Sequence, residues 1–208
     1  MNRRTIIAAA CAFASVVGFN GALNAQSDEP VDWSHIPEMS VGADDAPVTL
    51  IEYASLTCPY CADFHTDMLP LLQTEFIEQG YVRYVYREVF FDRFSLWAAM
   101  VARCGGEEKF WELTAYLYET QSTWRIGETS TEVVNNLRNV GQRFGLSEDE
   151  LDACLQDQDL ARALVARSED MKAEYGFTST PAYVINGETY VAMPYERLRE
   201  LIEAELRE

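Results

Sequence analysis

The sequence has few basic residues for its length. It contains 16 lysines and arginines against 34 aspartates and glutamates, which gives a formal net charge of -18 at pH 7. A chain this acidic repels the phosphates of nucleic acids and the headgroups of anionic lipids. We therefore expect no nucleic acid and no anionic lipid among its partners.

Long apolar segments are also absent after the first 25 residues. A basic start at residues 2–4 is followed by a short apolar run over 6–19 and by small residues that end at Ala25. This layout predicts a cleavable signal peptide over residues 1–25, and the run is too short for a membrane anchor. General secretion fits better than twin-arginine export, and Cys11 fits an ordinary signal residue better than a lipid-attachment site. We expect a periplasmic protein.

Cysteine is scarce, and its placement excludes several kinds of site. Only Cys58, Cys61, Cys104 and Cys154 follow the predicted signal peptide. There is no second CxxC to complete a structural zinc site. Ala62 stands where covalent haem attachment needs histidine. An even number of cysteines in an exported chain indicates disulfides.

The first half of the chain predicts a strand–helix–strand unit. Residues 26–45 are polar and broken by prolines, so we expect an extended lead-in. Residues 48–54 form an apolar, β-branched run typical of a strand covered on both faces. A helical pattern follows Cys61, with Pro70 expected to kink it and Gly80 to end it. Residues 81–89 predict a second strand, parallel to the first.

The second half predicts helices and then a hairpin. Residues 93–176 carry helical spacing, with one long stretch from Leu96 to Leu117. Two further helices are expected to start at the capping-box pairs Thr129/Glu132 and Ser147/Glu150. Residues 177–208 then predict two strands joined at Asn186–Gly187 and a last helix. The expected organisation is thus an α/β fold with 46–92 and 177–208 as its halves and 93–176 as a helical insertion.

The Cys58–Cys61 pair carries the chemistry. It follows a predicted strand and opens a predicted helix, where unpaired N–H groups and the helix dipole lower the pKa of a thiol. Pro59 suits the first helical turn because it has no N–H group to leave unpaired. We expect Cys58 to be the exposed nucleophile and Cys61 the buried resolving thiol.

The run EYASLTCPYC from Glu52 to Cys61, with Thr180–Pro181 far downstream, resembles the DsbA family of thioredoxin-fold periplasmic thiol:disulfide oxidoreductases. The resemblance covers nearly the whole chain after residue 25, including the insertion. It implies a thioredoxin-like fold, no cofactor or metal, and donation of a disulfide to exported proteins. It also implies unfolded thiol-bearing substrates and a membrane partner that re-oxidises the protein, which we expect to be a monomer.

Three roles follow from the resemblance. Thr180–Pro181 matches the cis-proline loop that faces the active-site pair. Glu52 matches the acidic residue beneath it, where burial would raise its pKa and let it shuttle the proton of Cys61. We also expect a structural disulfide between Cys104 and Cys154, as occurs in some relatives that resemble this sequence. Alternatives are a half-exposed strand glutamate at 52 and two separate buried thiols at 104 and 154.

Other readings stay open within and outside this chemistry. Tyr60 departs from the histidine of the strongest oxidants of the family, and Thr180 is shared with isomerase-type members, so an isomerase or reductase is the first alternative. A redox-inert holdase is another. A copper carrier could use Cys58, Cys61 and His65. We otherwise expect His65 to be a surface or packed residue outside the catalytic set.

Overall fold

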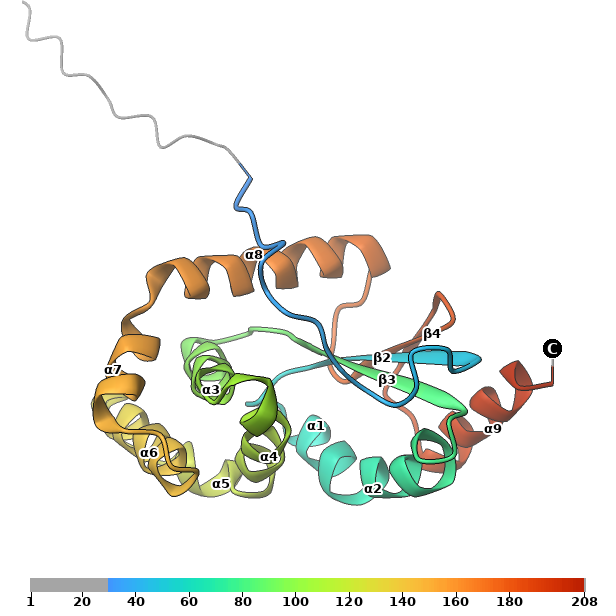
Figure 1. Ribbon diagram of the computed structural model, residues 1–208, viewed down its shortest axis with the longest axis horizontal. Helices are drawn as coiled ribbons and strands as arrows, with labels where there is room; N and C mark the ends of the chain where they lie inside the picture. Colours follow the sequence, from blue (N-terminus) through green and yellow to red (C-terminus); the bar gives the residue numbers. More distant parts are fainter. Residues whose placement is uncertain (1–29, 208) are drawn as a thin grey trace, which may run out of the picture. The chain divides into compact units, whose positions relative to one another are not determined.

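Five strands form one mixed sheet in the computed structural model, which describes residues 30–207 (Figure 1). The sheet order is β1-β3-β2-β4-β5. The central strands β2 and β3 run parallel, whereas the other neighbouring pairs run antiparallel. The strands are β1 (Met39–Val41), β2 (Val48–Ala54), β3 (Val82–Glu88), β4 (Ala182–Ile185) and β5 (Glu188–Val191).

Side chains of the central strands alternate between the two faces of the sheet. On β2, Leu50 and Ala54 belong to the larger core, whereas Ile51 and Tyr53 belong to a second core on the opposite face. The same alternation holds along β3 and β4. Both faces of β2 are therefore covered, as its apolar run predicts, and Glu52 falls on the face of the larger core.

The helix that follows the cysteine pair has an irregular backbone. It begins as α1 (Pro59–Asp63) and continues through the π-helical turn η1 (Phe64–Met68), α2 (Leu69–Leu72) and the second π-helical turn η2 (Gln73–Ile77). Proline inside a helix removes one backbone hydrogen bond and clashes with the preceding turn. Pro70 lies between the two π-helical turns, where such a disturbance is expected.

Six helices connect β3 to β4. They are α3 (Arg93–Cys104), α4 (Gly106–Glu119), α5 (Gln121–Trp124), α6 (Ser130–Arg143), α7 (Glu148–Gln156) and α8 (Gln158–Tyr175). The prediction of one continuous helical stretch from Leu96 to Leu117 is wrong. The chain breaks at Gly105–Gly106, where Gly106 has a φ of 67°, a value that glycine adopts without strain.

The two predicted capping boxes differ in the structure. Ser147 and Glu150 form both hydrogen bonds at the start of α7. At α6, Thr129 accepts a hydrogen bond from the amide of Glu132, but the Glu132 carboxylate accepts from the amide of Glu128 rather than from that of Thr129. Only Ser147 and Glu150 therefore form a complete capping box.

The last insertion helix covers one face of the sheet. Met171 and Tyr175 of α8 pack with the strand residues of the second core, while α1, α2 and the final helix α9 (Tyr195–Glu205) lie on the other side of the sheet (Figure 1). The segment between β3 and β4 thus supplies, through α8, the helix that covers the second face of the sheet.

The sequence predicts a signal peptide and an extended lead-in for the first 45 residues. The lead-in contains a short strand, β1, whose Ser40 lies opposite Val85 of β3; its backbone is extended, and its pairing with the sheet is a feature that the sequence does not predict. The signal peptide, Ala25 and Cys11 lie outside the described residues. Within residues 30–207, no helix is both long and apolar enough to cross a membrane.

Candidate active site

Cys58 lies at the amino end of α1, directly after the strand β2 and a tight turn. Its backbone is extended, Pro59 occupies the first helical turn, and its side chain is half-buried. The Cys58 thiol points to the loop before β4, with its sulfur 3.4 Å from the carbonyl oxygen of Thr180. The position at the helix start is the one that the sequence predicts.

The surroundings of Cys58 stabilise its anion. A hydrogen bond from the Cys61 thiol is the largest cause that lowers the pKa of Cys58 from 9.0 to about 6, although burial opposes the shift. A hydrogen bond from Thr180 and the backbone amides of Cys61 and Tyr60 lower it further. The helix start therefore contributes as predicted, but the neighbouring thiol contributes more.

Cys61 differs from its neighbour. It has no exposed surface and packs in the larger core. Burial raises the pKa of Cys61 well above its usual value, and the hydrogen bond to Cys58 and the charge of Glu52 raise it further. The two thiols thus have opposite properties: one is accessible and acidic, and the other is buried and stays protonated.

The loop before β4 faces the pair, and the Thr180–Pro181 peptide bond in it is cis. The Thr180 hydroxyl is buried and has no hydrogen-bond partner within residues 30–207, so its effect on the pKa of Cys58 is that of a donor available to the thiolate. Once Cys58 loses its proton, a hydroxyl beside the sulfur can donate to the thiolate. Pro181 also lines an apolar groove of about 380 Å³ together with Tyr60 and Met193.

A buried polar cluster lies beneath the pair. Glu52 has no exposed surface, so the half-exposed alternative is wrong. Its Oε2 lies 2.9 Å from Nε2 of His65 and accepts a hydrogen bond from the Tyr84 hydroxyl. Oε1 of Glu52 has no partner within residues 30–207. The carboxylate therefore faces the protein interior, and its charge acts on Cys61.

His65 is packed rather than at the surface. Its ring stacks on that of Tyr118 at 4.0 Å between centroids, and its Nε2 is directed to Glu52. It therefore does not join the two cysteines as a third ligand. No group of three metal-ligating side chains is found in the described part of the chain.

Sequence reasoning missed the contacts that the insertion makes with the active-site loop. The side chains of Gln121 and Arg125 donate hydrogen bonds to backbone carbonyls of residues 56–58. No motif marks either residue. The only signal is that a glutamine and an arginine follow the α4 region, a signal too common to single them out.

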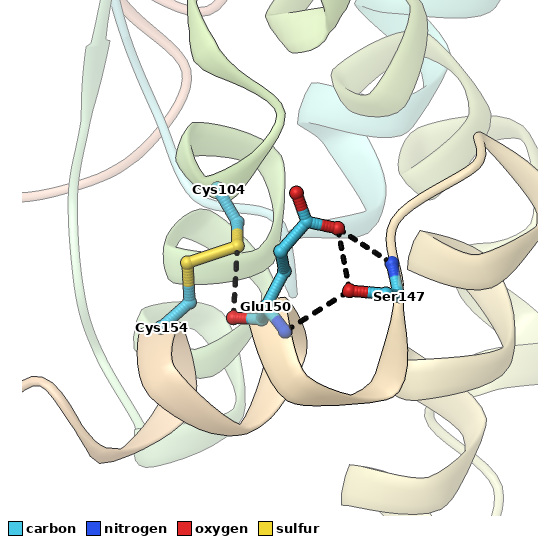
Figure 2. Close-up of a disulfide and its surroundings, with 4 residues drawn as sticks. All are labelled: Cys104, Ser147, Glu150 and Cys154. Atoms are coloured by element: carbon cyan, nitrogen blue, oxygen red, sulfur yellow. Dashed lines mark hydrogen bonds between the residues drawn. A yellow bond between two sulfur atoms is a disulfide. The ribbon is translucent and has the colours of Figure 1, made fainter.

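Cys104 and Cys154 form a disulfide between α3 and α7, with an S–S distance of 2.04 Å (Figure 2). The sulfur of Cys104 lies 3.4 Å from the carbonyl oxygen of Glu150. Figure 2 shows the capping box of Ser147 and Glu150 at the start of the same helix, α7. The bond is internal to the insertion, so the active-site cysteines remain a pair of their own.

A CxxC at a helix start opposite a cis-proline, on a sheet with a helical insertion, defines a thioredoxin-fold redox protein. The family model described as "Thioredoxin" matches residues 34–204. The crystal structure of Wolbachia pipientis alpha-DsbA1 superposes with a TM-score of 0.74 at 22% identity, over 81% of this chain and 90% of that one. The chain belongs to the DsbA family of thioredoxin-fold proteins.

Two curated relatives extend the comparison. "Disulfide bond formation protein D" of Bacillus subtilis is 25% identical over 172 residues, which are 80% of this chain and 76% of the relative. The "Putative protein-disulfide oxidoreductase" of Rickettsia bellii is 29% identical over 151 residues, 72% of this chain. Those residues are 57% of the rickettsial protein, so the chain matches little more than half of that relative's length.

Proposed function

We propose that the protein is a thiol:disulfide oxidoreductase that donates the Cys58–Cys61 disulfide to exported proteins. The observation that carries the proposal is the difference between the two thiols: Cys58 is accessible and its pKa is lowered to about 6, whereas Cys61 is buried and its pKa is raised. The names of the relatives and the membership of the DsbA family support the same activity.

The reaction starts from the oxidised pair. A substrate thiolate attacks the sulfur of Cys58, the Cys58–Cys61 bond breaks, and Cys61 leaves as a thiolate that takes up a proton. A second substrate thiolate then attacks the substrate sulfur of the mixed disulfide, and Cys58 leaves as a thiolate. The substrate loses two electrons and the enzyme disulfide gains them. Stabilising the Cys58 thiolate stabilises the reduced enzyme and makes the disulfide more oxidising.

The surrounding residues support these steps. Thr180 can donate to the Cys58 thiolate, and Pro181 lies where a substrate chain approaches. Glu52 is the buried group proposed to exchange the proton of Cys61, because its charge acts on that thiol. The groove beside Tyr60 is apolar, so it can bind the apolar side chains that unfolded proteins expose.

Further parts of the proposal rest on the family. We place the mature protein in the periplasm, where disulfides persist, and expect re-oxidation by a membrane partner. The residues proposed for the mechanism require no metal or other cofactor.

The test is stoichiometric oxidation of a reduced, unfolded protein with several cysteines. The oxidised wild type should form about one substrate disulfide per enzyme, while Cys58→Ala should form none. Cys61→Ala has no disulfide to donate, so its Cys58 is first converted to the mixed disulfide with 5-thio-2-nitrobenzoate. The thiolate of a substrate with a single cysteine should then attack Cys58, release thionitrobenzoate and stay bound, which mass spectrometry without reduction detects. A wild type that leaves substrate thiols intact, or that only rearranges a scrambled substrate, contradicts the proposal.

A further inference from the structure

The active-site loop is fastened to the insertion through its backbone. The side-chain amide of Gln121 donates to the carbonyl oxygen of Leu56 at 2.9 Å and to that of Cys58 at 3.0 Å. The guanidinium of Arg125 donates to the intervening carbonyl, that of Thr57, at 2.8 Å. Three consecutive carbonyls before α1 are thus held by two side chains from one short segment.

Gln121 is well suited to this role. It is 7% exposed, and an amide group has two N–H donors, both of which are used here. A buried amide that lost these acceptors would be left unsatisfied, which is costly. The pairing therefore favours one position of the loop relative to α5.

The segment that carries the two donors is itself anchored. The indole N–H of Trp124 donates to the carbonyl of Leu117 at 2.7 Å. The amide of Asn136 on α6 donates to the carbonyls of Trp124 and Ile126 at 3.2 and 2.8 Å. Because both sides of α5 are tied to longer helices, the donors are held in place.

A second contact fixes the same loop from the other side. The Thr57 hydroxyl donates to one carboxylate oxygen of Asp92 at 2.8 Å. The other oxygen accepts from the amide of Ser95 and caps α3. The loop residue Thr57 is thus held by its hydroxyl and by its carbonyl, in each case by a residue adjoining or within the insertion.

We propose that Gln121 and Arg125 are positioning residues that hold the 56–58 loop so that the Cys58 sulfur lies beside the amides at the start of α1, and that the insertion thereby contributes to the acidity of that thiol. The inference rests on the proposed function only in taking Cys58 as the reactive thiol. If the donors are lost, the loop peptide groups can rotate, and the distances from the sulfur to the amides of Tyr60 and Cys61 change. Cys58 is the N-cap residue of α1 but makes no side-chain capping hydrogen bond, so its sulfur feels these amides through their distance and orientation.

The direct test replaces Gln121 by methionine, which has a similar length and no donor. The rate of Cys58 alkylation by iodoacetamide, measured from pH 4 to 10 on the reduced protein, reports the thiolate fraction. We expect the midpoint to move to higher pH and the rate at pH 6 to fall about three- to tenfold, since one pKa unit is a tenfold change in the equilibrium. Rates above pH 9 should match the wild type.

Two further variants separate positioning from general destabilisation. Arg125 is exposed, so Arg125→Met, which removes the donor, should fold, and it should raise the alkylation midpoint by less than Gln121→Met does. Arg125→Lys keeps a donor, so its midpoint should lie between those of Arg125→Met and the wild type. Gln142→Met, at an exposed position of α6, is the control and should leave the profile unchanged. Melting temperatures measured alongside reveal any loss of folding.

The outcomes are distinct. If Gln121→Met and Arg125→Met both keep the wild-type pH profile, the inference is overturned, even if their melting temperatures fall. If Gln121→Met does not fold, the profile of Arg125→Met decides alone. Failure of the wild type to oxidise a substrate rejects the proposed function but not this inference, because alkylation of Cys58 needs no turnover.

Discussion

Nε2 of His65 lies 2.9 Å from Oε2 of Glu52, and both side chains are buried directly beneath the cysteine pair. His65 comes one helical turn after Cys61, and Glu52 lies on the central strand β2. Two tyrosines contact these side chains: the Tyr84 hydroxyl donates to Glu52, and the ring of Tyr118 stacks on that of His65. A carboxylate, an imidazole and a buried thiol are thus brought together in a site shielded from water.

Replacing Glu52 by glutamine should slow the reaction without removing the nucleophile. The amide keeps the shape but cannot carry a proton to or from Cys61, and general acid–base groups typically contribute about a hundredfold or more. We expect substrate oxidation to fall by about that factor, while the alkylation midpoint of Cys58 stays near pH 6. Glu112→Gln, at an exposed position of α4, is the control. An unchanged oxidation rate argues that Glu52 has only a packing role.

Replacing His65 by glutamine should affect the reaction through Glu52. Glutamine can still donate one hydrogen bond to the carboxylate but cannot accept and pass on a proton. We expect a smaller decrease than for Glu52→Gln, and the double variant should be no slower than Glu52→Gln alone. Multiplied effects in this double-mutant cycle would show that the two residues act independently.

The acidity of Cys58 predicts how the stability of the reduced protein depends on pH. Its pKa is about 6 in the folded protein and 9.0 ordinarily, so the contribution of its thiolate is full above pH 9 and is lost as the pH falls through 6. The oxidised protein lacks this group. The melting temperature of the reduced form, relative to that of the oxidised form, should therefore rise between pH 6 and pH 9. Cys58→Ala should remove the slope.

Much of this site can be predicted from sequence because its signals are local. A CxxC after a β-branched run predicts a thiol at a helix start, and the unbroken apolar pattern of β2 predicts a strand buried on both faces. These two features need only a few neighbouring residues, and the structure shows both. The threonine–proline pair alone predicts only a turn, and its place opposite the cysteines followed from the resemblance to the DsbA family.

The remaining features depend on contacts between distant segments. Whether His65 faces solvent or Glu52 depends on how the helix sits on the sheet, which periodicity does not specify. The contacts of Gln121 depend on the path of the insertion. The strand β1 has three residues and is stable only through its pairing with β3, so its own sequence carries little signal.

The Cys104–Cys154 disulfide should stabilise the fold without taking part in the reaction. It closes a loop of 50 residues, which corresponds to about 4 kcal/mol in the chain-entropy model. Replacing both cysteines by alanine should lower the melting temperature by roughly 8–16 °C and leave substrate oxidation nearly unchanged. Ser147→Ala, which removes only the adjacent helix cap, should cost about 1 kcal/mol. Alkylation of both cysteines in the native protein would contradict the bond.

The buried ion pair between Arg103 and Glu88 should make folding sensitive to a single substitution. Arg103 Nε lies 2.6 Å from Glu88 Oε1, and both side chains are less than a tenth exposed. Burial acts to raise the pKa of Glu88, but the charge and hydrogen bonds of Arg103 outweigh it and the pKa is lowered. Arg103→Met leaves this carboxylate without its main partner, and removing one member of such a pair costs about 3–5 kcal/mol.

The same substitution has a defined pH dependence. Because the pKa of Glu88 is lowered in the folded protein, its contribution is present above its ordinary value of 4.5 and is lost as the pH falls below it. The difference in unfolding free energy between wild type and Arg103→Met, measured by urea denaturation, should therefore be largest near pH 7 and shrink below pH 4.5. Replacing Glu88 by leucine together with Arg103→Met should recover much of the stability, since no unpaired charge then remains. A difference that stays constant with pH would show that Arg103 contributes through packing instead.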